Sequence, residues 1–260
     1  MNNEIKNNQS HSSKSPCGGF RGLIILGGTL LVVSYLVFSL SFSTKNGEIV
    51  CEQLRITFSD NNIGLITEND IEQFLKARNL HPVGKKVKDI RAVEIERALN
   101  AKEVVKSAEF FITPSGVSRI RITQRIPKFR VFPNNGNSYY IDTERNIVRT
   151  RSNHASYLPI VSGNVSFEMA SGELFDFVEF LKRNTFWNAQ IKQIYVRADR
   201  QIELVPRVGD SIILLGTLDD YQSRLEKLRR LYINAFNTIG WNRYQILDLR
   251  FRGQIVGVRN

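Results

Sequence analysis

The stretch Gly22–Thr44, GLIILGGTLLVVSYLVFSLSFST, contains no charged residue and is bracketed by Arg21 and Lys45. A helix rises about 1.5 Å per residue, so this stretch would reach roughly 34 Å, enough to cross a hydrocarbon core of about 30 Å. Lipid offers the backbone no hydrogen-bond partner, so a segment of this kind must be helical. The sequence therefore predicts one transmembrane helix over residues 22–44.

Two other interpretations of this stretch fit less well. A cleaved signal peptide has a shorter apolar core of about 7–15 residues, and the only candidate cleavage site here is the poor match Ser41-Phe42-Ser43. A buried helix of a soluble core normally has one polar face, which this stretch lacks.

The charges on either side of the stretch predict its orientation. Lys6, Lys14 and Arg21 outnumber Glu4 before it, whereas the basic residues just after it are diluted by acidic ones. The positive-inside rule then places residues 1–21 in the cytoplasm, as a disordered tail rich in Asn and Ser, and all later residues outside the cytoplasmic (inner) membrane, in the periplasm.

Net charge and cysteine content narrow the class of protein. The chain of 260 residues has a formal charge of +11, of which +9 falls after residue 44. No zinc finger, helix-turn-helix or RNA-binding signature accompanies this charge, so we predict no nucleic-acid partner and attribute the charge to solubility and attraction to anionic lipid or cell-wall polymer. Cys17 and Cys51 would lie on opposite sides of the membrane, so no disulfide joins them.

Residues 49–125 predict a first folded domain. Strand-like alternation over 51–58 is followed by a helix over 68–79, with Thr67 and Asp70 spaced as in a capping box. A second helix over 91–100 and a hairpin formed by 105–113 and 117–126 complete the order β-α-α-β-β. In the last strand Ile alternates with Arg, which gives one buried face and one cationic face.

Residues 126–260 predict a second domain of mixed antiparallel β structure with helices, so the fold class is α+β. A helix is expected over 172–183 and another over 219–237, with Asp219 as the cap of the latter. Three short strands over 191–196, 202–205 and 211–215 are joined by short turns, which indicates an antiparallel meander.

Four motifs in this order are similar to those of one family. They are QRIPKFRV (124–131), YYID (139–142), LPIVSG (158–163) and YQILDLRF (244–251). Together with β-α-α-β-β directly after one apolar span, they resemble the bacterial cell-division family FtsQ/DivIB, which has a POTRA (polypeptide-transport-associated) domain followed by a β domain. Gln124 and Phe129 depart from the family's commoner residues, and Thr143–Asn146 replaces a turn that usually contains Gly; Asn tolerates the left-handed backbone that such a turn needs.

The residues provide no constellation for catalysis. His11, His81 and His154 are isolated, and the sequence has no nucleophile elbow, Ser-x-x-Lys pair or phosphate-binding loop. Asp219 and Asp220 lie at the expected start of a helix, where acidic side chains interact favourably with the helix dipole, so this pair needs no catalytic explanation. We therefore predict no enzyme activity, no catalytic or metal site, and no cofactor.

Binding by a surface is the alternative, and the last strand is the candidate site. Its alternation predicts Leu247, Leu249 and Phe251 in the core and places the candidate partner-binding residues Tyr244, Ile246, Asp248 and Arg250 on the other face, at a sheet edge open to strand addition. In the competing interpretation, this strand pairs within the protein and its outward-facing side chains bind no partner.

The resemblance implies a membrane scaffold at the division septum. FtsB/FtsL-like coiled-coil proteins would bind its β domain, and other division proteins would bind the POTRA-like domain and the span. A POTRA-bearing secretion component that binds unfolded clients is the alternative function.

Overall fold

The computed structural model describes residues 27–39, 49–59, 64–150 and 158–259. A helix covers 27–39, the middle of the predicted span, and the rest of 22–44 lies outside the described residues, as do the predicted tail, Cys17 and His154. Among the described residues, no helix combines the length and the apolar character needed to cross a membrane.

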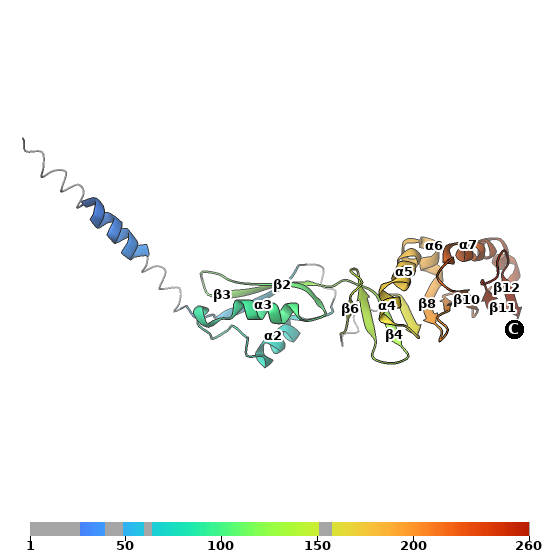
Figure 1. Cartoon of the computed structure of the whole chain (residues 1–260), viewed down its shortest axis with the longest axis horizontal. Helices are drawn as coiled ribbons and strands as arrows, with labels where there is room; N and C mark the ends of the chain where they lie inside the picture. The colour runs from blue at the N-terminus through green and yellow to red at the C-terminus, as the bar shows by residue number, and fades with distance from the viewer. Residues whose placement is uncertain (1–26, 40–48, 60–63, 151–157, 260) are drawn as a thin grey trace, which may run out of the picture.

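The first domain is built on a three-stranded sheet. Its elements are β1 (Gln53–Phe58), α2 (Glu68–Ala77), the 3-10 helix η1 (Val87–Asp89), α3 (Ala92–Asn100), β2 (Val105–Ile112) and β3 (Val117–Gln124). This confirms the predicted order β-α-α-β-β. The strand order is β1-β3-β2, with β3 parallel to β1 and antiparallel to β2. Helices α2 and α3 cover one face of the sheet and leave the other open (Figure 1).

Local sequence signals explain the first helix. The Thr67 side chain accepts a hydrogen bond from the Asp70 amide at 3.2 Å, and the Asp70 carboxylate accepts one from the Thr67 amide at 2.9 Å, which completes the predicted capping box. Ile71 and Leu75 are fully buried against the sheet, where Ile120 and Ile122 belong to the same apolar cluster. The capping signal and the apolar stripe therefore agree on where this helix begins and which face it buries.

The second domain is built on a nine-stranded sheet. Its strands are β4 (Pro127–Pro133), β5 (Tyr139–Asp142), β6 (Ile147–Val148), β7 (Ile160–Gly163), β8 (Ile191–Val196), β9 (Ile202–Pro206), β10 (Ile212–Gly216), β11 (Tyr244–Asp248) and β12 (Val256–Arg259). They lie in the order β12-β11-β10-β9-β8-β7-β4-β5-β6.

The predicted antiparallel character of this sheet holds only in part. The meander β8-β9-β10 is antiparallel as predicted. The pairs β4–β7, β7–β8 and β10–β11 are parallel, however, so the sheet is mixed. The helical segments between β7 and β8 and between β10 and β11 provide the long crossovers that parallel neighbours require.

The helices of the second domain pack on one face of its sheet (Figure 1). They are α4 (Phe167–Ser171), α5 (Glu173–Arg183), α6 (Thr185–Gln190), α7 (Tyr221–Leu231), the π-helical turn η2 (Tyr232–Phe236) and α8 (Asn237–Ile239). The prediction that Asp219 caps α7 is wrong, because Asp220 occupies the cap position without a side-chain cap bond and Asp219 accepts from the Thr217 hydroxyl at 2.6 Å instead.

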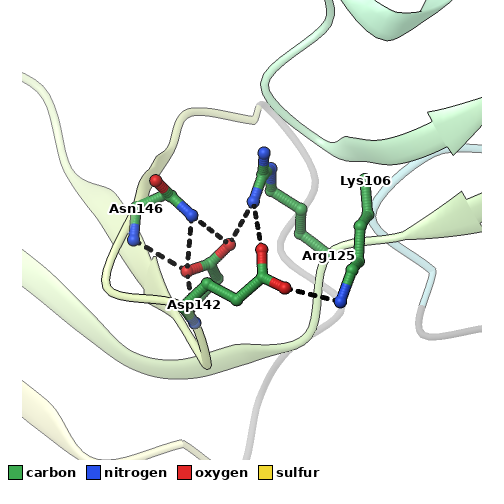
Figure 2. A network of polar contacts seen from close by, with 5 residues as sticks. Lys106, Arg125, Asp142 and Asn146 are labelled. Carbon is green, nitrogen blue, oxygen red and sulfur yellow. Dashed lines mark hydrogen bonds and ion pairs between the residues drawn. The ribbon is translucent and has the colours of Figure 1, made fainter.

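The two domains meet through an apolar cluster and a polar network. Tyr140 of β5 and Val148 of β6 are buried in the apolar cluster of the first domain. Figure 2 shows the Arg125 guanidinium directed at the buried Asp142 carboxylate, 2.7 Å away. Arg125 also lies 3.2 Å from Glu144, which pairs with Lys106 of β2 at 2.5 Å. The hydrogen bond from Lys106 lowers the pKa of Glu144 below its usual value.

The turn that follows YYID takes an unexpected form. Arg145, rather than Asn146, adopts the left-handed conformation, with φ 66°. Its guanidinium donates to Asp176 at 2.6 Å and to the Ser171 carbonyl at 2.9 Å, and it lies 4.3 Å from the centre of the Phe175 ring. These contacts with α4 and α5 hold Arg145 in a conformation that an L-residue seldom adopts.

Candidate partner-binding edge

Strand β11 carries Tyr244, Ile246 and Asp248, and it is not the edge of the sheet. It pairs with β10 on one side and with β12 on the other. The prediction that residues 244–250 form an edge strand is therefore wrong. The chain turns back after β11, with Gly253 at φ 75°, and β12 covers the edge. In the described part of the chain, the outer side of β12 has no neighbouring strand.

An exposed apolar row reaches this edge across three strands. Ile212 of β10 is opposite Ile246, and Ile246 is opposite Val258 of β12. Ile212 is 40% exposed, Val258 46%, and Ile246 is half-buried. These residues lie on the sheet face away from the helices, because their neighbours Ile213 and Leu247 are buried in the helix-side core.

Tyr244 does not share this face. The register between β11 and β12 shifts between Tyr244 and Ile246, as in a β-bulge. A Cβ placed on Gly257 would lie 2.6 Å from the Tyr244 ring, and Tyr244 packs against the helix-side core. Sequence alternation misses this because one extra residue reverses the face to which a side chain points.

Asp248 and Arg250 form a local ion pair. The Arg250 guanidinium donates to both Asp248 oxygens, at 2.6 and 2.9 Å, and the Arg250 amide donates to the same carboxylate at 3.0 Å. The hydrogen bond from Arg250 holds the pKa of Asp248 below its usual value, although burial opposes this shift. Arg250 also donates to Gln201 at 2.9 Å, so the pair ties the end of β11 to the loop before β9.

Lys227 of α7 is a further residue of the site that the sequence analysis missed. Its ammonium group donates to the Phe251 carbonyl at 2.7 Å and lies 3.4 Å from the Gln254 carbonyl, so it fixes the turn between β11 and β12. Phe251, predicted in the core, is 47% exposed in this turn. A lysine on a helix gives no sequence signal for carbonyls more than 20 residues away, so only the fold reveals this contact.

The described residues offer little other chemistry. No three His, Cys, Asp or Glu side chains there come together in a way that could hold a metal ion. Cys51 is a free thiol, buried 3.1 Å from the Ser118 hydroxyl. The geometry of the β11–β12 region offers backbone groups and apolar side chains, which suit the binding of an extended peptide.

Comparison with known proteins gives two family matches. Residues 49–123 match the model of the POTRA-like domain, and residues 126–258 match a family described as FtsQ/DivIB, C-terminal related. No curated protein matches the chain.

The chain therefore combines a POTRA-like domain with a C-terminal domain of the FtsQ/DivIB type. Because the second match covers just over half of the sequence, the chain belongs to the FtsQ/DivIB family, a family of cell division.

Proposed function

We propose that this protein is a non-enzymatic scaffold of the division machinery that binds an FtsB/FtsL-like coiled-coil partner by strand addition at β12. The observation that carries the proposal is the edge itself, where an unpaired strand edge adjoins the exposed row of Ile212, Ile246 and Val258. A partner strand placed beside β12 would bond to its free backbone groups and cover the apolar row.

The edge of β12 lacks several of the features that usually prevent strand addition. Natural edge strands are protected by a proline, an inward-facing charge, a covering loop, a bulge or a short length, and β12 has only the last two, because it is four residues long and lies beside the bulge at Tyr244. β12 has the sequence Val-Gly-Val-Arg, with Val256 38% exposed and Val258 46% exposed, and its only charge is at the last position, Arg259. An edge strand with exposed apolar side chains favours aggregation unless a partner covers it, which supports a binding role.

The four predicted site residues then divide into two roles. Ile246 would contact the partner through the exposed row. Tyr244 supports β12 from the helix side beneath Gly257, while Asp248 and Arg250 hold the turn that positions β12. In this proposal they are positioning residues, and the partner's main contacts fall on Val256 and Val258.

We further propose that residues 22–44 anchor the scaffold in the cytoplasmic membrane with both domains outside the cytoplasm. The absence of charge over this stretch and the helix at 27–39 support the anchor. Other division proteins would contact the POTRA-like domain and the span. The scaffold would link and regulate septal wall synthesis by raising the local concentration of its partners.

The test is a pair of edge substitutions, Val256→Lys with Val258→Lys, measured by affinity for the coiled-coil partner. Lysine on an edge strand opposes strand addition, and two apolar contacts are lost, so we expect more than about tenfold weaker binding. Val93→Lys, at an exposed apolar position of α3, is the matched control and should bind normally. Unchanged affinity of the folded double variant would show that β12 is not the site.

A further inference from the structure

Cations gather where the chain enters the first domain. Lys85, Lys86 and Lys88 lie in and next to the loop before α3, and Arg55 of β1 and Arg119 of β3 lie on the open face of the sheet. Lys86, Lys88 and both arginines are exposed, while Lys85 is half-buried and donates to the Asn79 carbonyl at 2.6 Å. We call these five residues the basic entry patch.

Backbone pairing brings the patch together. Val50 forms a bridge with Lys86, the Cys51 amide donates to the Lys85 carbonyl at 2.9 Å, and the Val87 amide donates to the Ile49 carbonyl at 2.9 Å. On the other side of this segment, a Cβ on Gly116 would lie 2.8 Å from the Ile49 side chain, so the β2–β3 turn adjoins it. The lysines and the start of β3 therefore flank the entering chain.

The charges of the patch have no ion-pair partner in the described chain. Arg55 and Arg119 are direct neighbours on parallel strands, which lie about 4.8 Å apart, and like charges in this arrangement repel. None of the five residues has an ion pair with a described carboxylate, whereas nearby Arg121 pairs with Glu109 and Arg91 pairs with Glu94. An external anionic surface would relieve this repulsion.

We propose that the basic entry patch rests on anionic phospholipid headgroups of the membrane that holds residues 22–44. This inference rests on the membrane anchor of the proposed function. Residues 40–49 connect the helix at 27–39 to the patch, and a chain of that length reaches at most roughly 35 Å. Each basic residue held at an anionic surface strengthens the attraction roughly fivefold, within a Debye length of about 8 Å.

The patch would orient the first domain on the membrane. The β12 edge lies at the opposite end of the molecule, since β6 adjoins the first domain and β12 ends the sheet (Figure 1). A first domain held against the headgroups would therefore direct the partner-binding edge away from the membrane.

The test uses the full chain reconstituted in vesicles of phosphatidylcholine, with or without phosphatidylglycerol. A fluorophore on Ser115→Cys, in a Cys17→Ser background, reports energy transfer to headgroup-labelled lipid; Cys51 is buried and remains unlabelled. We expect transfer to increase several-fold with phosphatidylglycerol and to return to the phosphatidylcholine level in high salt.

The variant Lys86→Glu with Lys88→Glu and Arg119→Glu should abolish this increase. Glu at 119 faces Arg55, so the fold is not endangered. The control Lys182→Glu with Lys192→Glu and Arg207→Glu reverses three exposed charges of the second domain and should retain the increase. Equal transfer on the two lipids would overturn the proposal, as would an equal loss in both variants.

A separate measurement distinguishes failure of the anchor from failure of the patch. If an alkaline wash strips the chain from phosphatidylcholine vesicles, the anchor in the proposed function is wrong. Co-flotation of the full chain with phosphatidylglycerol vesicles at neutral pH then tests the patch directly. Flotation that the Lys86, Lys88 and Arg119 variant loses would support it, and flotation unaffected by that variant would overturn it.

Discussion

The two sheets of this protein each have one face under helices and one face open to solvent, but the open faces differ in chemistry. In the first domain, Arg55, Arg119 and Phe111 form a row across the three strands, and the row is dominated by charge. In the second domain, the row that ends at β12 consists of Ile212, Ile246 and Val258.

This difference suggests different partners for the two domains. A mainly cationic face has little apolar area to bury and attracts an anionic surface over a distance of several ångströms. An apolar row beside a free strand edge acts only on contact, through area removed from water and through directed backbone bonds. The two ends of the molecule therefore suit unlike ligands.

The largest expected effect comes from breaking the link between the two domains. Arg125→Met would leave the Asp142 carboxylate, only 2% exposed, without its cation. Removing one partner of a buried pair costs about 3 kcal/mol of unfolding free energy. Urea denaturation followed by circular dichroism would measure this loss. Arg121→Met removes an exposed pair and should cost under about 1 kcal/mol. Equal costs for the two variants would show that the Arg125–Asp142 pair stabilises the fold no more than an exposed pair does.

The next largest effect is expected at the contact between Gly257 and Tyr244, which positions β12. Gly257→Val would place a side chain in the position of the Tyr244 ring and displace β12, at a cost of about 1–3 kcal/mol and with about tenfold weaker partner binding. Scanning calorimetry of the protein alone would measure the stability loss, and titration calorimetry with the coiled-coil partner would measure the affinity. Adding Tyr244→Ala should restore part of the binding, since the obstructing ring is removed; no recovery would argue against the contact as the cause.

A smaller effect is expected from the two neighbouring arginines on the open face of the first domain. Arg119→Glu replaces the repulsion with Arg55 by attraction, so the first domain should become more stable by about 0.2–1 kcal/mol. Thermal unfolding at low salt would detect it. The gain should shrink at high salt, and a loss of stability at low salt would contradict the proposed repulsion.

The smallest effect concerns pH. Because the folded-state pKa of Asp248 is lowered by Arg250, the pair contributes stability that is present above the unfolded pKa of about 3.9 and is lost as the pH falls through the lower folded value. Unfolding free energies measured across this acid range should fall less steeply in Asp248→Asn than in the wild type. Identical slopes would show that the pair is not coupled to folding.

Short-range signals in the sequence predicted much of this fold. Thr67 and Asp70 predicted the start of α2, and the Ile and Arg alternation predicted the buried and cationic faces of β3. These predictions succeed because a capping box and the alternation of side chains along a strand each depend on residues only a few positions apart.

The candidate site depended on long-range pairing and was predicted less well. Sequence alternation predicts the strand edge at β11, because nothing local shows that β12 returns beside it. The same alternation predicts the wrong face for Tyr244, because a bulge depends on both paired strands. The contacts of Lys227 and the left-handed Arg145 likewise depend on atoms far away in the sequence.

The nine-stranded sheet also fixes the distance between the first domain and the β12 edge. Strand β6 adjoins the first domain and β12 ends the other side, so eight interstrand steps of about 4.8 Å set a separation of roughly 38 Å between them. This length changes only by whole strands. Substitutions within the strands can therefore alter what is bound at the far end while leaving the distance at which it is held unchanged.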